Sequence, residues 1–196
     1  MSLLEAIAAL FGVANILLIV RRSVWNFPAA LVMVSLTGIV LWDAKLYSDA
    51  GLQVFFFVVN ILGWVLWARN RGEEGEIVVE RLGTLGRIAW IAVALIAIYG
   101  WGWFMAINTD AAWPWWDASV AMLSVAAQLL MTRRYIDNWH WWVVVNLISI
   151  VLYWNKHLYW FAGLYVIFLG MAVWGLVEWR AAERAQAARR AGVLAA

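Results

Sequence analysis

Long apolar runs alternate with short polar connections along the whole chain. Seven runs approach or reach the length of about 20 residues that a helix needs to cross the hydrocarbon core of a bilayer. They fall at residues 4–20, 27–42, 51–68, 88–106, 116–132, 139–154 and 159–178. The second and sixth runs are short and meet their neighbours through tight loops. The pattern predicts an all-α membrane protein with seven transmembrane helices.

The composition supports a membrane protein that crosses the bilayer several times. Of the 196 residues, 66% are hydrophobic and 13% are charged, whereas soluble domains are about half apolar. The first run does not resemble a cleavable signal peptide, because Glu5 stands where a basic segment should be and Arg21 and Arg22 follow the apolar stretch. We therefore expect residues 4–20 to form the first membrane helix.

The positive charges are divided unevenly between the two sets of loops. Lys45 and Lys156 lie in one set, and the other twelve positive residues lie in the alternate loops or the C-terminal segment: Arg21, Arg22, Arg69, Arg71, Arg81, Arg87, Arg133, Arg134, Arg180, Arg184, Arg189 and Arg190. Cytoplasmic loops are enriched in such residues. The asymmetry predicts an external N-terminus and a cytoplasmic C-terminus, which requires an odd number of spans. The net charge of +2 arises from these loops and indicates no nucleic-acid partner.

An internal repeat appears when the sequence is compared with itself at an offset of 112 residues. The first three apolar runs then align with the last three without a gap. The matched pairs include Arg21–Arg22 with Arg133–Arg134, Asn26 with Asn138, Trp42 with Trp154, Gly63 with Gly175 and Trp67 with Trp179. One extra run, 88–106, separates the halves, so both halves enter the membrane in the same direction.

The repeat predicts a 3+1+3 architecture, in which two parallel three-helix repeats are joined by one linker helix. We expect four segments: 1–70 for the first repeat, 71–112 for a cytoplasmic loop and the linker helix, 113–182 for the second repeat, and 183–196 for a cytoplasmic tail. In transporters with parallel repeats, the substrate site lies near the midplane, where the two halves face each other.

The chain resembles the PnuC family of bacterial nicotinamide riboside transporters. The resemblance covers nearly all seven runs and is carried by LYSDAGLQVFFFVVNILGWVLW at 46–67, WWDASVAMLSVAAQLLMTRRYIDNW at 115–139, and the W-x-x-W of Trp139 and Trp142. It implies a seven-helix protein of the bacterial inner membrane. It also implies facilitated diffusion of a vitamin-like nucleoside for NAD synthesis, with trapping by a separate kinase. Related proteins move thiamine or riboflavin, so another vitamin is the alternative substrate.

Two helical faces combine a primary amide with tryptophan, and the family resemblance places substrate-binding residues on both. Gln53, Asn60 and Trp64 lie at positions i, i+7 and i+11 of the third run. In the sixth run, Trp139, Trp142 and Asn146 lie at i, i+3 and i+7. A carboxamide can exchange two hydrogen bonds with an amide side chain, and a pyridinium ring gains from an indole face. We expect these six residues to form a substrate site.

Packing is the main alternative for each of these residues. A lone intramembrane amide commonly joins two helices, with about 0.6–2 kcal/mol per hydrogen bond. Tyr165 is the repeat counterpart of Gln53 and could face the substrate or a neighbouring helix. Asp117, the counterpart of Glu5, could hydrogen-bond a ribose or a neighbouring helix, or take part in proton coupling. Trp139 lies near a span end, so its assignment rests mainly on the family motif.

Catalytic and metal sites are not indicated. The chain has no cysteine, its two histidines form no H-E-x-x-H motif, and neither lysine follows a glycine as in a Walker A loop. We expect no cofactor, no catalytic residue and no metal ligand. A paired, motif-spaced set of acids or histidines is also missing, which argues against an intramembrane enzyme acting on lipid. A receptor or scaffold without transport remains a further alternative, and the sequence leaves homo-oligomer formation open.

Overall fold

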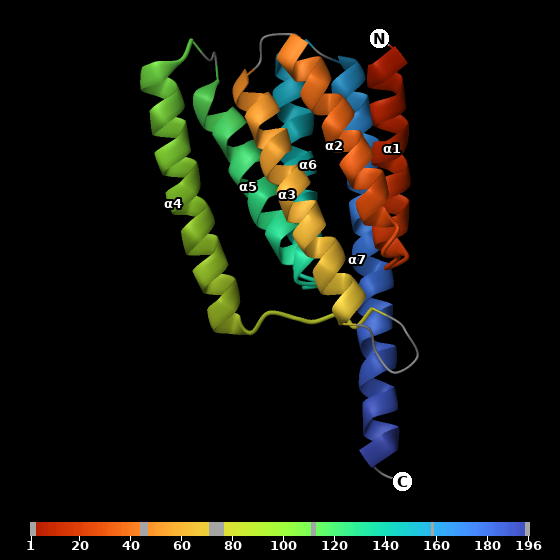
Figure 1. Cartoon of the computed structure of the whole chain (residues 1–196). Coiled ribbons are helices and arrows are strands. Elements are labelled where there is room, and N and C mark those ends of the chain that lie inside the picture. Colours follow the sequence, from red (N-terminus) through yellow and green to blue (C-terminus); the bar gives the residue numbers. More distant parts are fainter. Residues whose placement is uncertain (1–2, 44–46, 71–76, 111–112, 158, 195–196) are drawn as a thin grey trace. The chain divides into compact units, whose positions relative to one another are not determined.

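The computed structural model describes residues 3–43, 47–70, 77–110, 113–157 and 159–194, and these form seven helices (Figure 1). The helices are α1 (Leu3–Val20), α2 (Asn26–Asp43), α3 (Tyr47–Arg69), α4 (Thr84–Asn108), α5 (Pro114–Thr132), α6 (Asn138–Asn155) and α7 (Tyr159–Leu194). The all-α prediction is confirmed. Lys45 and Arg71, which contributed to the charge asymmetry, lie outside the described residues.

Five of the seven helices are long and apolar enough to cross a membrane, judged over the described residues: α1, α2, α3, α4 and α7. The other two, α5 and α6, contain 19 and 18 residues. Both contain polar side chains, including Asp117 and Gln128 in α5 and Asn146 and Ser149 in α6. Polar side chains within membrane helices are candidates for a ligand site.

Helix α7 is much longer than its apolar run, which ends near residue 178. It continues to Leu194 through a segment rich in alanine, arginine and glutamate, all of which favour helices. Gln186 in this extension is buried: its Nε2 donates to the Ile77 carbonyl at 3.3 Å, and its Oε1 accepts from the Val79 amide at 3.2 Å. The extension thus holds the segment that precedes α4.

The chain divides into two compact units, each described by itself. Unit 1 comprises Met1–Val79, Met131–Arg134 and Glu178–Ala196, and unit 2 comprises Glu80–Leu130 and Tyr135–Val177. In unit 1, α2 packs against both α1 and α3. In unit 2, a hydrophobic cluster joins Ala94, Leu123 and Val145, which come from α4, α5 and α6.

The turn before α2 and the turn before α6 have the same local structure. Arg22 and Arg134 both adopt positive φ, at 54° and 62°. The Asn26 side chain then donates to the Ser23 carbonyl at 2.6 Å, and the Asn138 side chain donates to the Tyr135 carbonyl at 2.7 Å. Each turn is closed by an asparagine at the first position of the helix that follows.

Glycines of α3 and α7 accept a ring from the preceding helix. A Cβ added to Gly63 would lie 2.5 Å from Cε1 of Phe27. One added to Gly175 would lie 2.5 Å from Cζ2 and 2.6 Å from Cζ3 of Trp139. Such distances leave no room for a side chain. The glycine therefore allows the ring to reach the helix backbone in each case.

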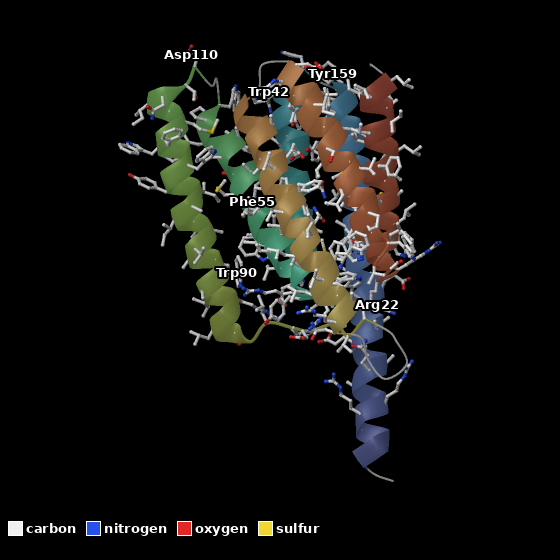
Figure 2. The ribbon with its side chains drawn as sticks, in the orientation of Figure 1. Arg22, Trp42, Phe55, Trp90, Asp110 and Tyr159 are labelled. Atoms are coloured by element: carbon white, nitrogen blue, oxygen red, sulfur yellow. The ribbon has the colours of Figure 1, made fainter. Side chains whose placement is uncertain are left out.

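Two tryptophans of unit 1 form hydrogen bonds that connect helix ends. Trp67 Nε1 donates to the Met131 carbonyl at 3.2 Å, and Trp179 Nε1 donates to the Ile19 carbonyl at 3.0 Å. The two indoles also contact each other, with ring centroids 5.8 Å apart. Arg22 lies at this end of unit 1 and Trp42 lies at the other end of α2 (Figure 2). The contacts gather chain segments that carry Arg21, Arg22, Arg69, Arg133, Arg134 and Arg180.

Candidate substrate site

The stripe on α6 continues further than its first three residues suggested. Trp139, Trp142 and Asn146 are followed by Ser149 and Tyr153, again at alternating spacings of three and four residues. That spacing keeps all five side chains on one helical face. Asn146 is 5% exposed and Ser149 is 0% exposed, so both polar groups are buried. The face therefore combines aromatic rings with two buried polar side chains.

Ser149 has a polar atom that the surrounding helices leave unsatisfied. Its Oγ is completely buried and lacks a hydrogen-bond partner within the part of the chain that the structure describes. The buried amide of Asn146 lies three residues earlier on the same face. A buried polar group without a hydrogen bond costs about 1–3 kcal/mol. A ligand that supplies hydrogen bonds at this face would remove that cost.

Tyr165 of α7 belongs to the same neighbourhood in unit 2. Its ring stacks on Tyr153 with centroids 5.2 Å apart and an interplanar angle of 23°. Tyr153 stacks in turn on Phe161 at 5.5 Å. The Tyr165 hydroxyl has the side chains of Tyr153 and Ser149 as its polar neighbours, although Ser149 Oγ lies outside hydrogen-bonding geometry. The structure thus brings Tyr165 beside the polar end of the α6 stripe.

The two tryptophans of the stripe have different surroundings. Trp139 is 2% exposed, and the edge of its six-membered ring packs on Gly175. Trp142 is half-buried and packs against the cluster of Ala94, Leu123 and Val145. Trp142 therefore retains more surface for a ligand than Trp139 does.

Asp117 pairs with a lysine in unit 2. Lys156 Nζ lies 3.0 Å from Oδ1 and 3.3 Å from Oδ2 of Asp117, and each side chain is 29% exposed. The pair joins the start of α5 to the residue after α6. Of the roles open to Asp117 from sequence, contact with a neighbouring helix is the one seen here.

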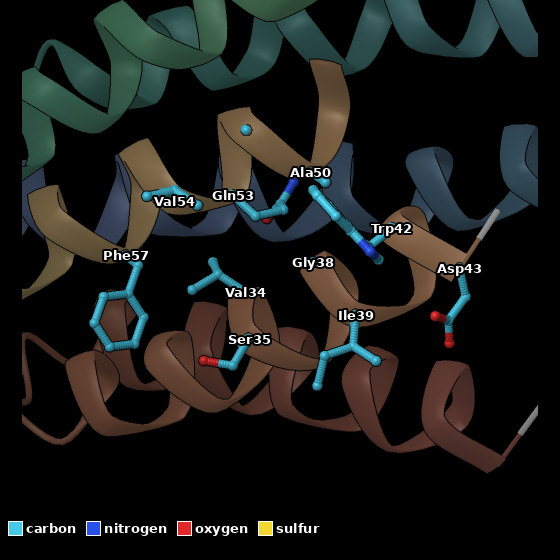
Figure 3. Close-up of a pocket in the computed structure, with 11 residues that line it drawn as sticks. Val34, Ser35, Gly38, Ile39, Trp42, Asp43, Ala50, Gln53, Val54 and Phe57 are labelled. Carbon is cyan, nitrogen blue, oxygen red and sulfur yellow. The ribbon is translucent and has the colours of Figure 1, made fainter. Parts of the chain in front are cut away.

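Gln53 lines a groove between α2 and α3 in unit 1 (Figure 3). The groove has a volume of about 520 Å³, and most of its lining is apolar. Its polar lining residues are Ser35, Asp43 and Gln53. Gly38 lies opposite Gln53, and a Cβ there would be 3.5 Å from the Gln53 Cβ. The groove could admit a small molecule beside the Gln53 amide.

Asn60 and Trp64 lie further along α3 than the groove. Asn60 is buried, and its Nδ2 donates to the Phe56 carbonyl one turn earlier at 2.8 Å. Trp64 is 39% exposed. The three α3 residues therefore share a helical face without sharing one environment. Gln53, Asn60 and Trp64 belong to unit 1, whereas Asp117, Trp139, Trp142, Asn146 and Tyr165 belong to unit 2.

Ser149 and Tyr153 are the residues that the sequence reasoning missed. The signal was available, because their spacing from Asn146 continues the pattern of the stripe. Serine and tyrosine are common in membrane helices, however, and only the burial of the hydroxyl distinguishes Ser149. In the described residues, no group of three histidine, aspartate or glutamate side chains could hold a metal ion.

Comparison with known proteins identifies the family. Residues 2–181 match the model of a family described as the nicotinamide mononucleotide transporter. The chain belongs to this nicotinamide mononucleotide transporter family. It is accordingly a multi-pass membrane protein of a transporter family, and the family resemblance drawn from its sequence motifs is confirmed.

Two similar relatives are named for different vitamins. The nicotinamide riboside transporter PnuC of Escherichia coli (strain K12) is 29% identical, over 96% of this chain and 90% of the relative. The riboflavin/roseoflavin transporter RibM of Streptomyces davaonensis is 27% identical, over 89% of this chain and 83% of the relative. Proteins named for different vitamins are thus similar to this chain at nearly equal levels.

A solved structure shares the fold of this family member. The crystal structure of the vitamin B3 transporter PnuC superposes with a TM-score of 0.76, covering 92% of this chain and 82% of that one, at 24% sequence identity. The likeness establishes the helical membrane fold.

Proposed function

We propose that the protein mediates facilitated diffusion of nicotinamide riboside across the bacterial inner membrane. Inside the cell, a separate kinase would trap the nucleoside for NAD synthesis. The observation that carries the proposal is the buried amide of Asn146, one turn from Trp142 on α6. The name of the Escherichia coli relative supports the same substrate.

The chemistry of the α6 face matches the nicotinamide group. An asparagine amide can donate one hydrogen bond to a carboxamide and accept another from it. The indole of Trp142 can stack on the aromatic ring, which contributes on the order of 1–3 kcal/mol by analogy with nucleobase stacking. The positive charge of the pyridinium adds a cation–π attraction. Tyr165 of α7 is proposed to complete this face. Gln53, Asn60 and Trp64 of α3 are also proposed as substrate-binding residues.

Two of the residues expected from sequence have weaker support as ligands. Asp117 is paired with Lys156, so its contact with a ribose would require that pair to open. Trp139 packs on Gly175, so we propose that it mainly positions α6 against α7. Both stay in the proposed site as residues that support it.

Riboflavin or another vitamin is the second candidate substrate. The similarity to RibM favours it specifically, because that relative is named for riboflavin and roseoflavin. A competition binding assay with purified protein separates the candidates. Unlabelled nicotinamide riboside should displace labelled nicotinamide riboside at a far lower concentration than riboflavin or thiamine does. Tighter binding of riboflavin or thiamine would identify that vitamin as the substrate and would leave the proposed transport function unchanged.

We also propose the 3+1+3 arrangement, with α4 as the linker between two parallel repeats. Helices α2 and α6 begin and end at positions that the repeat offset relates, and α3 and α7 begin at related positions. The positive-φ arginines, the asparagine-closed turns and the glycine contacts recur in the same way. The mutual contact of Trp67 and Trp179, each donating to the carbonyl at the related position of the other half, supports a two-fold relation.

The proposed orientation places the arginine-rich ends of the helices in the cytoplasm. Gly83 and Asp110 flank α4 at opposite ends. The sequence contains no cysteine, so a cysteine introduced at either position would be the only one able to react. A cysteine at Gly83 meets no atom within 4 Å, and Asp110 is exposed. In intact cells, Asp110→Cys should react with an impermeant thiol reagent and Gly83→Cys should not. Permeabilised cells should label both variants, and the reverse pattern in intact cells would contradict the orientation.

Transport should be passive. Neither lysine of the sequence follows a glycine as in a Walker A loop, and Asp117 is engaged with Lys156. In sealed liposomes, internal nicotinamide riboside should rise to the external concentration and no further. The measurement is uptake of labelled substrate with and without an imposed proton or sodium gradient. Accumulation above the external concentration in either gradient would refute facilitated diffusion.

A further inference from the structure

Ser149 Oγ is fully buried and meets no partner with hydrogen-bonding geometry among the described residues, although the Tyr165 hydroxyl lies nearby. We propose that Ser149 is a specificity-determining residue that hydrogen-bonds a hydroxyl group on the ribose of the substrate. The inference rests on the proposed function, because it takes nicotinamide riboside as the ligand. Neither the helix-face pattern considered from sequence nor the family motif includes this residue.

Several polar side chains of the described helices bond back to their own helix in a way that Ser149 does not. Thr132 Oγ1 of α5 and Asn15 Oδ1 of α1 are also buried without a partner among the described residues. Ser119 and Ser124 each donate to the carbonyl four residues earlier, at 2.7 Å. Asn155 of the same helix does so at 2.8 Å. This bond back to the helix is the usual fate of a serine hydroxyl in an apolar segment. Ser149 Oγ is fully buried and makes no such bond.

The position of Ser149 suits a ligand that Asn146 also binds. The two residues are three positions apart on α6, which is about 4.5 Å along the helix axis. Asn146 is buried as well. In nicotinamide riboside, the carboxamide and the ribose are attached to different positions of one ring. Two buried polar groups on one helical face can therefore contact the two polar parts of one molecule.

The neighbours of Ser149 favour a hydroxyl-bearing ligand over an apolar one. The Tyr165 hydroxyl lies beside it, and the Tyr165 ring is held by its stack on Tyr153. Hydroxyl groups can donate and accept hydrogen bonds together. A ribose hydroxyl placed here could accept from Ser149 and donate to the neighbouring tyrosine oxygen.

The first half of the chain offers a matched control. The repeat offset relates Ser149 to Thr37 of α2, and it relates Asn146 to Val34. The polar pair on α6 thus corresponds to a single hydroxyl residue on α2, with a valine in place of the amide. Thr37 is not part of the proposed pair of Asn146 and Ser149. Replacing Thr37 therefore removes a hydroxyl at the related helical position and leaves that pair intact.

The test compares ligands as well as variants. Binding of nicotinamide riboside and of its 2′-deoxy and 3′-deoxy analogues would be measured by calorimetry on the parent, Ser149→Ala, Ser149→Thr and Thr37→Val proteins. Ser149→Ala should bind nicotinamide riboside about three- to tenfold more weakly, as expected for one lost hydrogen bond. For the deoxy analogue that lacks the hydroxyl bound by Ser149, the affinities of Ser149→Ala and the parent should be equal. Ser149→Thr should restore most of the affinity, and Thr37→Val should match the parent.

The possible outcomes distinguish failure of the proposed Ser149 contact from failure of the proposed function. Equal affinities of the parent and Ser149→Ala for nicotinamide riboside would overturn the inference. An equal loss for all three ligands would also overturn it, because Ser149 would then act through helix packing. Failure of the parent to bind nicotinamide riboside at all would instead refute the proposed substrate.

Discussion

Asn146→Leu should bind nicotinamide riboside at least about tenfold more weakly than the parent, while the protein folds normally. Leucine has the same number and branching of side-chain heavy atoms, suits a membrane helix better and replaces a buried amide. The bound carboxamide would then lose partners at a desolvated position, which costs about 1–3 kcal/mol. Calorimetry on variants that elute as single gel-filtration peaks measures the effect.

Asn155→Leu is the matched control for this prediction. It makes the same exchange on the same helix, but its amide is exposed and donates to the Val151 carbonyl at 2.8 Å. We expect its affinity to equal that of the parent. Similar affinities for the parent and Asn146→Leu would mean that the amide is not part of the site.

Replacement of Trp142 should give a graded result that supports the same site. Trp142→Phe keeps an aromatic ring with a weaker cation–π attraction, and Trp142→Leu removes the ring face. The affinity should therefore fall less for phenylalanine than for leucine. Equal affinities for both variants and the parent would assign Trp142 to the hydrophobic cluster with Ala94, Leu123 and Val145 alone.

Gly175→Ala should destabilise the protein strongly for so small a change. The added methyl group would lie 2.5 Å from Cζ2 of the Trp139 ring, which is itself 2% exposed and has little room to move. Overpacking of this kind costs about 1–3 kcal/mol, and the better helix propensity of alanine offsets up to about 1 kcal/mol of that. The net cost of about 1–2 kcal/mol should lower the apparent melting temperature in detergent by about 2–8 °C, at roughly 2–4 °C per kcal/mol.

Gly170→Ala is the control on the same helix. No atom lies within 4 Å of a Cβ added to Gly170, so only the gain in helix propensity should remain. Its melting temperature should equal or slightly exceed that of the parent. Gly63→Ala should resemble Gly175→Ala, because its methyl group would meet the fully buried ring of Phe27. A melting temperature of Gly175→Ala at or above that of Gly170→Ala would contradict the packing argument.

The sequence by itself determined where the helices lie, and its uneven distribution of arginine predicts their direction across the membrane. Apolar runs and turn residues act over a few neighbouring positions, so the starts of α2, α6 and α7 could be placed to within one residue. The helical spacing of Trp139, Trp142 and Asn146 likewise fixed which side chains share a face. The end of α7 was not predictable from hydropathy, because its extension is polar and is held partly by the contact of Gln186 with Ile77 and Val79.

Only the tertiary structure decided what each face meets. A helical repeat specifies which residues lie together, but the partner comes from distant parts of the chain. Trp139 packs on Gly175 of α7, and Asp117 pairs with Lys156 across 39 positions of sequence. Ser149 Oγ is fully buried and meets no partner with hydrogen-bonding geometry among the described residues, even though the Tyr165 hydroxyl of another helix lies nearby. Burial and hydrogen bonding depend on these long-range contacts, which local sequence patterns do not encode.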